Sequence, residues 1–442
     1  MRHRIPALTK LFVAALLAAS CSGQAAPIRN VLLISIDTLR ADHLGAYGHE
    51  RPTSPNLDRL ARAGVLFEDA TTTSPWTLPA HVSLLTGLYP DGHGVRTNEH
   101  FLGRGIPTLA QLLADEGFET GAVVNGYFVG ARFGLARGFD SYEMFEEDQS
   151  RTGAARDVTG AGIRWLRDRR DRRNFLFLHY FDVHSSYQSA AKYERMFIEK
   201  PNRLTGDIIE LMMVNHGDFE PTDEDLDHFA RLYDAGIRQL DDALARLFEF
   251  LDANGWLEDT LVIVTSDHGE EFLEHGKMVH GHSHYQELMH VPLIMRGPGL
   301  PAGTRVELPV SLIDVAPTVL SLVGIRTPAD MTGVDLRSTW SSPEESPAER
   351  LIFAETGPMQ EDALRSVRSG RFKLILDVRD ERYELYDLNE DPSELHDLAA
   401  ERPERFQWLR AELSRFTEES RLSKTLENTE EDIKHLEALG YL

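Results

Sequence analysis

Short runs of apolar residues alternate with amphipathic stretches along the chain up to about residue 345. Continuous apolar runs of this length are typical of buried parallel strands, and a 3.6-residue spacing of apolar positions is typical of helices. We therefore predict strands at 30–37, 118–126, 174–184 and 260–269, the last followed by an apolar segment at 291–299. Between and after them we predict helices at 54–64, 153–170, 222–255 and 311–324, with a surface excursion at 185–223. This alternation predicts an α/β fold, with a mostly parallel sheet and helices on both faces.

The pattern changes after residue 345. Residues 363–388 alternate between apolar and polar positions and contain two turn signals, Ser369-Gly370 and Arg379-Asp380. Such alternation predicts a small antiparallel sheet, and the charged tail from Glu401 predicts a terminal helix. We assign 27–345 to a main domain that carries the chemistry and 346–442 to a C-terminal α+β subdomain with a helical tail.

Residues 1–26 have the layout of a secretory signal, with a basic start and a short apolar run at 11–19. Cys21, the only cysteine, follows this run directly, as in bacterial lipoprotein signals. The alternative is ordinary cleavage near residue 25 with an incidental cysteine. We expect the protein to work outside the cytoplasm, in the periplasm or at the outer surface, and to meet a membrane only through a lipid on Cys21.

The formal net charge of −25 over 442 residues makes nucleic acid an unsuitable partner, because an acidic surface repels phosphates. The charge does not exclude a small anionic substrate, since a metal ion or a helix N-terminus can reverse the local potential. Residue composition does not indicate the oligomeric state.

Polar residues stand at the ends of three predicted strands. Asp37 ends the first, Asp182 and His184 follow another, and Asp267-His268 end the strand at 260–269. Functional groups in such sheets gather beyond the carboxyl ends of the strands. Each Asp alone could cap the next helix, but Asp37, Asp267 and His268 together predict a divalent-cation site.

The segment SPWTLPAHVSLLTG, residues 74–87, reads as the start of a further helix with Thr77 near its N-terminus. A simple interpretation is that Thr77 caps the helix. The other is that its hydroxyl projects from the positive helix end beside a metal, where it could act as a nucleophile toward an anionic ester.

Several segments have the character of family motifs: DTLRADHLGAYG, SPWTLPAHVSLLTGLYP, FLHYFDVH, SDHGEEFLEHG and, near the C-terminus, LYDLNEDPSELHDL. Together they resemble the sulfatase family of the alkaline phosphatase superfamily. The resemblance runs in order through nearly the whole chain after residue 26. It implies an alkaline-phosphatase-like fold and an ester hydrolase.

The resemblance also implies roles for individual residues. Asp37, Asp267 and His268 match metal-ligand positions, Thr77 matches the nucleophile, and His184 matches an active-site histidine. His280 and His282 belong to a group of five histidines between 275 and 290 and lie near the position of a substrate-binding lysine. That group could hold a second metal or an anion, or it could be a solvated loop. The spacing of Asp182 and His184 differs from that of two-metal relatives, so we expect one metal.

The sequence departs from the formylglycine sulfatases at several positions. Their motif is Cys- or Ser-x-Pro-x-Arg, whereas this chain has Thr77-Leu78-Pro79-Ala80-His81. Thr38 replaces a second metal-binding Asp, Asn125 stands about where a catalytic Lys is expected, and His268 replaces the common Asn. A Thr nucleophile with an Asp/Asp/His metal set is more similar to phosphodiesterases and phosphotransferases of the superfamily.

We therefore expect a metal-dependent hydrolase of sulfate or phosphate esters, with phosphorus esters favoured on mechanism. The alternatives are an arylsulfatase-like sulfuric ester hydrolase and an extracytoplasmic phospho-headgroup transferase. The expected cofactor is one Mn, Zn, Ca or Mg ion, with Mn and Zn slightly favoured by the imidazole ligand. The expected substrate is a small anionic ester or a sulfated or phosphorylated glycan or lipid.

The residues assigned to this chemistry fall into three groups. The catalytic residues are Thr77, His184 and His282; the substrate-binding residues are His81, Asn125 and His280; the metal ligands are Asp37, Thr77, Asp267 and His268.

Overall fold

The computed structural model describes residues 27–145, 154–200, 202–343, 349–356 and 363–427. The predicted signal segment with Cys21 lies outside these residues, as do parts of the predicted C-terminal subdomain. Within the described ranges, none of the helices has the length and apolar composition that a membrane crossing requires.

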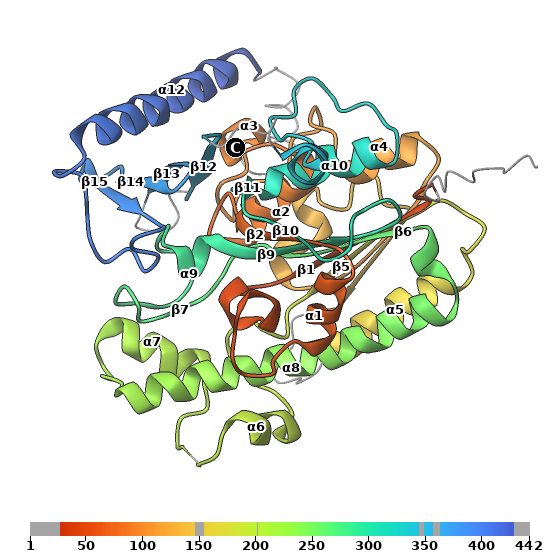
Figure 1. Ribbon diagram of the computed structural model, residues 1–442, viewed down its shortest axis with the longest axis horizontal. Helices are drawn as coiled ribbons and strands as arrows, with labels where there is room; N and C mark the ends of the chain where they lie inside the picture. Colours follow the sequence, from red (N-terminus) through yellow and green to blue (C-terminus); the bar gives the residue numbers. More distant parts are fainter. Residues whose placement is uncertain (1–26, 146–153, 201, 344–348, 357–362, 428–442) are drawn as a thin grey trace, which may run out of the picture.

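A nine-stranded sheet lies at the centre of the molecule (Figure 1). Its order is β10-β2-β9-β6-β1-β5-β3-β4, with β11 also paired to β2. The strands are β1 (Asn30–Ile36), β2 (Val65–Thr71), β3 (Glu119–Asn125), β4 (Ser141–Phe145), β5 (Asn174–Tyr180), β6 (Thr260–Ser266), β9 (His290–Arg296), β10 (Thr304–Val306) and β11 (Val310–Ser311). β9 pairs antiparallel with β2 and β6, whereas the other pairs in this sheet are parallel. The predicted mostly parallel sheet is therefore confirmed.

Helices cover both faces of this sheet, as predicted (Figure 1). One face packs against α1 (Pro55–Arg62), α5 (Ala155–Arg167) and α8 (Asp223–Ala253), and the other against α2 (Thr77–Thr86), α4 (Leu109–Asp115) and α10 (Val315–Leu322). Strand side chains alternate between the two cores: Leu32 and Ile34 of β1 enter the first, and Leu33 enters the second. β1 is buried on both faces, which explains its uninterrupted apolar run.

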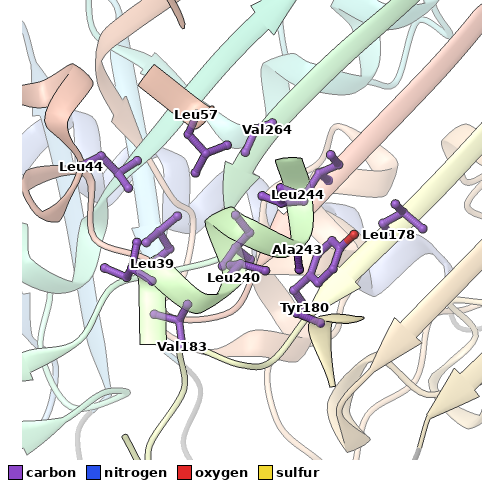
Figure 2. Packing of buried hydrophobic residues seen from close by; sticks show 14 of the residues in the cluster. Leu39, Leu44, Leu57, Leu178, Tyr180, Val183, Leu240, Ala243, Leu244 and Val264 are labelled. Carbon is purple, nitrogen blue, oxygen red and sulfur yellow. The ribbon is translucent and has the colours of Figure 1, made fainter. Parts of the chain in front are cut away.

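The long helix α8 forms much of the first core. Thr222 and Asp225 form a capping box at its start, so two backbone N–H groups at the helix N-terminus are hydrogen-bonded. Leu240 and Leu244 pack in one cluster with Leu178 and Tyr180 of β5 (Figure 2). Asp223, Glu224 and Glu249 of α8 are exposed, whereas Asp234 and Asp241 are buried.

The predicted excursion at 185–223 contains two short helices, α6 (Ala191–Phe197) and α7 (Ile208–His216). The remaining short elements are α3 (Pro90–His93), α9 (Gln286–Met289), α11 (Arg337–Ser341), β7 (Glu271–Phe272) and β8 (Met278–Val279). β7 and β8 form a small antiparallel pair at the start of the histidine-rich segment.

A second, antiparallel sheet follows near the C-terminus, as predicted. Its strands are β12 (Leu351–Glu355), β13 (Leu364–Ser369), β14 (Phe372–Asp377) and β15 (Arg382–Asp387), in that order across the sheet. The predicted turns at 369–370 and 379–380 join the last three strands. The terminal helix α12 (Pro403–Glu427) packs Leu409 and Leu413 against this sheet (Figure 1).

Leu240→Ala is expected to destabilise the protein by about 2–5 kcal/mol, because it leaves a cavity in the core between α8 and the sheet. Urea unfolding followed by circular dichroism measures the shift. Ile209→Ala serves as the control, since Ile209 is 69% exposed and surface substitutions usually change stability by less than about 0.5 kcal/mol. An equal shift for both variants would contradict the assigned packing.

Candidate active site

Two neighbouring parallel strands carry acidic residues to one edge of the main sheet. Asp37 follows β1 directly, and Asp267 follows β6, with Ile36 opposite Ser266 in register. His268 comes next in the chain. Donor atoms of Asp37, Asp267 and His268 lie within 4.8 Å of one another, and all three residues are buried. The structure thus brings together the three residues that the sequence predicted as metal ligands.

A tight turn after β1 directs Asp37 into this group. Thr38 has a φ of 56°, a left-handed conformation that is uncommon for a β-branched residue. The Thr38 N–H donates to Asp267 Oδ1 (3.2 Å), and the Tyr233 hydroxyl donates to the Thr38 carbonyl (2.6 Å). Strained backbone of this kind persists where its surroundings hold it, and it is concentrated at functional sites.

The two oxygens of Asp267 have different surroundings. Oδ1 accepts hydrogen bonds from the backbone N–H groups of Thr38 and His268 (3.2 and 3.0 Å). Oδ2 is buried without a hydrogen-bond partner. Burial alone would raise the pKa of this carboxyl, but the neighbouring imidazoles, His268 first, lower it. Asp267 therefore presents one charged oxygen to the centre of the group.

His268 is oriented by its own backbone segment. Its Nδ1–H donates to the Gly269 carbonyl (2.9 Å), so Nε2 faces Asp267 Oδ2 (3.5 Å) and Thr77 Oγ1 (3.4 Å). Burial by itself would lower the pKa of His268, yet Asp267 and Asp37 raise it above the usual value. The two carboxylates therefore favour a positive charge at this place, which a bound cation would supply.

Thr77 is the first residue of α2, and Trp76 occupies the capping position without a side-chain cap. The interpretation of Thr77 as a helix cap is therefore wrong. Its hydroxyl instead lies beside His268 at the positive end of α2, where a developing negative charge is stabilised. Pro79 lies in the first turn, where its missing N–H costs little.

His81 lies one turn further along α2 and is fully buried. Its Nδ1–H donates to the Thr77 carbonyl (2.8 Å), and Ser35 Oγ lies 2.9 Å from its Nε2. The structure does not place His81 in the wall of the cavity described next. The predicted substrate contact is thus replaced by a contact with the backbone of Thr77.

A cavity of about 360 Å³ opens in front of Thr77. Asp37, Thr77, His184, Ser185 and His280 form its polar wall, and Trp76, Gly126, Tyr127, Phe128, Phe181, Ile208, Met212 and Val279 form the remainder. Ile208 and Met212 come from α7, so the excursion at 185–223 covers part of the site. Arginine and lysine are absent from this described lining.

Two histidines in the cavity wall each have a hydrogen-bonding neighbour at Nδ1. His184 Nδ1–H donates to the Ser185 carbonyl (2.6 Å), and the ring stacks on Phe181 with centroids 4.1 Å apart. His280 Nδ1 lies 3.0 Å from Glu270 Oε1. Burial lowers the pKa of His184 to about 3 and raises that of Glu270 to about 7. The Glu270–His280 pair can therefore hold a proton near neutral pH.

Two predicted residues lie elsewhere. His282 Nε2 lies 2.7 Å from Glu271 and lines a separate cavity of about 490 Å³ between the histidine-rich segment and β14–β15. The structure therefore favours His280 over His282 at the site. Asn125 ends β3 next to Gly126, and its backbone carbonyl, rather than its side chain, contacts a neighbouring imidazole.

The sequence reasoning missed Glu270 and His179. Glu270 stands three residues after Asp267, and His179 stands two residues after Phe177 on β5. The period of two along a strand places His179 on the same face as Phe177, toward α2. This alternation could have indicated which face of the sheet His179 occupies. Because the residues around His179 are apolar on both faces, the sequence pattern did not distinguish the two faces.

Three groups in the described residues have metal-binding geometry: Asp37/Asp267/His268, His81/His179/Asp267 and His43/His49/Asp234. In the third, the Arg51 guanidinium lies 2.8 Å from Asp234 and already balances its charge. The first two share Asp267, whose Oδ2 lacks a hydrogen-bond partner. The first group therefore fits a divalent cation, with oxygen and imidazole donors converging.

The sulfatase family profile matches residues 29–325, and a profile for the C-terminal region of N-sulphoglucosamine sulphohydrolase matches residues 274–421. The chain is 26% identical to a choline-sulfatase from Rhizobium meliloti over 439 residues, which covers 84% of this chain and 82% of the relative.

Two further proteins illustrate the range of similarity. A multifunctional alkaline phosphatase superfamily protein, PehA from Trinickia caryophylli, is 29% identical over 395 residues, covering 70% of this chain and 76% of the relative. A solved structure in complex with its substrate D-glucosamine-2-N,6-O-disulfate has a TM-score of 0.76 at 20% identity, covering 89% of this chain and 98% of that one. The structural match supports an alkaline-phosphatase-like fold.

Zn²⁺ or Mn²⁺ is expected to raise the melting temperature. A ligand that binds only the folded state adds about 2.7 kcal/mol to the free energy of unfolding when its concentration is a hundredfold above its Kd. Asp267→Asn should remove this shift, because it weakens the central charge of the site. Differential scanning calorimetry with and without metal measures both.

Asp234→Asn is the control and should keep the shift, since Arg51 already neutralises that cluster. If Asp234→Asn loses the metal-induced shift and Asp267→Asn keeps it, the metal binds at the His43/His49/Asp234 cluster, which contradicts the assigned site.

Proposed function

Because the chain belongs to the sulfatase family, whose members are ester hydrolases, we propose that it cleaves monoanionic esters through Thr77 with the help of one divalent metal. Within this class we favour phosphorus esters, namely phosphodiesters and related monoanionic phosphoesters. The observation that carries the proposal is the position of Thr77, which lines the cavity as the first residue of α2. Its hydroxyl lies 3.4 Å from His268 Nε2.

Asp37, Asp267, His268 and the Thr77 hydroxyl are the residues that would hold the metal. A divalent ion there would lower the pKa of a coordinated hydroxyl and offset negative charge on the ester. Thr77 Oγ would attack the phosphorus: its hydroxyl proton passes to water in the cavity, a P–O bond to Thr77 forms, and the P–O bond to the leaving group breaks as the leaving oxygen is protonated. Water subsequently hydrolyses the phospho-threonine ester and regenerates Thr77. The N–H groups at the start of α2 favour the anionic group during both steps.

Departure of the leaving group requires a proton. His184 and His280 face the cavity, and Glu270 contacts His280 Nδ1. When the proton of this pair resides on Glu270, Nδ1 of His280 accepts the hydrogen bond and Nε2 carries a proton. That proton can pass to the leaving oxygen while Nδ1 takes the proton of Glu270. We therefore assign general-acid chemistry to the Glu270–His280 pair and leave His184 to orient the ester.

The cavity lining supports the substrate class. Its aromatic and aliphatic side chains suit an apolar or aromatic part of the substrate, and no cationic side chain lines it in the described residues. A dianionic phosphomonoester or a multiply sulfated glycan requires more positive charge than one metal and one helix end provide. A monoanionic ester requires less positive charge in the site.

The choice of phosphorus over sulfur rests on the nucleophile. Threonine is a secondary alcohol, and its oxidation gives a ketone, not the formylglycine aldehyde on which the resembled sulfatases depend. The second candidate is nevertheless a sulfate monoester, which is also monoanionic, because curated relatives of this chain include sulfatases.

Thr77→Ala is expected to reduce kcat by about three orders of magnitude or more, whereas Thr77→Ser should retain part of the activity because it keeps a hydroxyl. The substrates are a nitrophenyl phosphodiester, a nitrophenyl phosphate and a nitrophenyl sulfate, each assayed with Mn²⁺, Zn²⁺, Ca²⁺ and Mg²⁺. Mass spectrometry of acid-quenched enzyme should find the covalent group on Thr77.

Full activity of Thr77→Ala would overturn the nucleophile. Turnover of the sulfate alone would overturn the preference for phosphorus while leaving the ester hydrolase in place.

From the sequence pattern of residues 1–26 alone, we also propose that the enzyme is located outside the cytoplasm and is anchored to a membrane by a lipid on Cys21. Metabolic labelling with a fatty acid in a bacterial host should label the wild-type protein, and Cys21→Ala should lose the label and appear in the soluble fraction. Equal labelling of both would contradict the anchor.

A further inference from the structure

His179 stands inside the site although no motif pointed to it. It is the penultimate residue of β5, opposite Ser35 of β1, and it is fully buried. Its Nε2 lies 3.4 Å from Asp37 Oδ2, and donor atoms of His179 and Asp267 lie within 4.8 Å of each other. The parallel pairing of β5 with β1 therefore places an imidazole directly beside the acidic group.

The tautomer of His179 is set by its neighbour strand. Nδ1–H donates to the Asn125 carbonyl at the end of β3. Nε2 therefore carries a lone pair, and in the described structure it is buried without a hydrogen-bond partner. Gly126, at a φ of 124°, permits this approach, since a Cβ there would lie 3.4 Å from the His179 ring.

His81 offers the contrast. Its Nδ1–H is directed to the Thr77 carbonyl and its Nε2 to the Ser35 hydroxyl, so both ring nitrogens have partners. Although His81 Nδ1 lies only 3.6 Å from Asp267 Oδ2, it has no lone pair to offer. Of the two imidazoles flanking Asp267 on the α2 side, only His179 presents a donor to the centre.

A lone pair directed at carboxylate oxygens in a buried site is repulsive unless a cation lies between them. His268 repeats the arrangement: a backbone carbonyl holds its Nδ1–H, and Nε2 faces the same carboxylates. Metal-binding histidines are held in this way, with the second ring nitrogen donating to a carbonyl or carboxylate.

We infer that His179 is a further ligand of the metal, so that Asp37, His179, Asp267 and His268 bind it together with the Thr77 hydroxyl. This inference rests on the proposed metal-dependent function. Two imidazole nitrogens among oxygen donors suit Zn²⁺, Co²⁺ or Mn²⁺, whereas Ca²⁺ prefers oxygen donors alone. The site should therefore select a transition metal over calcium.

The affinity experiment uses the purified full chain. Equilibrium dialysis against Zn²⁺ or Ca²⁺, followed by elemental analysis, should give one Zn²⁺ per chain and a strong preference for Zn²⁺. His179→Gln should weaken Zn²⁺ binding by at least about tenfold, since even outer-shell partners of metal ligands contribute about 10–100-fold. The control is His284→Gln, which should keep the affinity within a few-fold, because His284 is also fully buried but its ring nitrogens contact Ser366 and Thr356. Circular dichroism monitors folding of each variant.

A second measurement does not depend on a variant. In the Co²⁺-loaded wild-type protein, the Nδ1–H protons of two ligating histidines should give two exchangeable, strongly shifted proton NMR signals. His179→Gln should lose one of them, and His284→Gln should keep both.

The possible outcomes distinguish the role of His179 from the proposed metal-dependent function. A single shifted signal in the wild type, or unchanged Zn²⁺ affinity in folded His179→Gln, overturns the role of His179 and leaves the proposed function standing. Failure of the wild type to bind any divalent metal overturns both.

Discussion

Asp37 and Asp267 hold two carboxylates close together in a buried site, and their mutual repulsion is the constraint to which the surrounding structure responds. In a medium of low polarity such repulsion is expensive unless positive charge or N–H donors are near. The backbone N–H groups of Thr38 and His268 meet one oxygen of Asp267. The imidazoles and the positive end of α2 surround the other carboxylate oxygens. A cation bound between the two carboxylates would remove their remaining repulsion.

Helix α2 connects this charge to the reaction. Its first residue, Thr77, presents a hydroxyl to His268, and its fifth, His81, hydrogen-bonds to the Thr77 carbonyl. The position that is arginine in the resembled formylglycine motif thus supports the turn that carries the nucleophile. Because Ser35 of β1 also contacts His81, the helix start is tied to the strand that ends in Asp37. Nucleophile and acidic group are held by one network.

Much of the fold could be predicted from local pattern. β1, β5 and β6 are mostly apolar because both of their faces are buried, and such runs are readable without tertiary information. The order of the strands is not readable in this way, since β1 lies between β5 and β6, which are distant in sequence. β2, with its mixed residues VLFEDAT, and the reversed direction of β9 were likewise outside the reach of periodicity.

For the site, the sequence by itself determined the residues that stand at element ends: Asp37, Asp267 and His268 after strands, and Thr77 at the start of a helix. Those positions follow from where apolar runs stop. Only the tertiary structure decided which imidazoles join them. The direction of a histidine lone pair depends on the carbonyl that holds its other nitrogen, and for His179 that carbonyl belongs to Asn125, on a different strand. A relation between strands 54 residues apart leaves no trace in local periodicity.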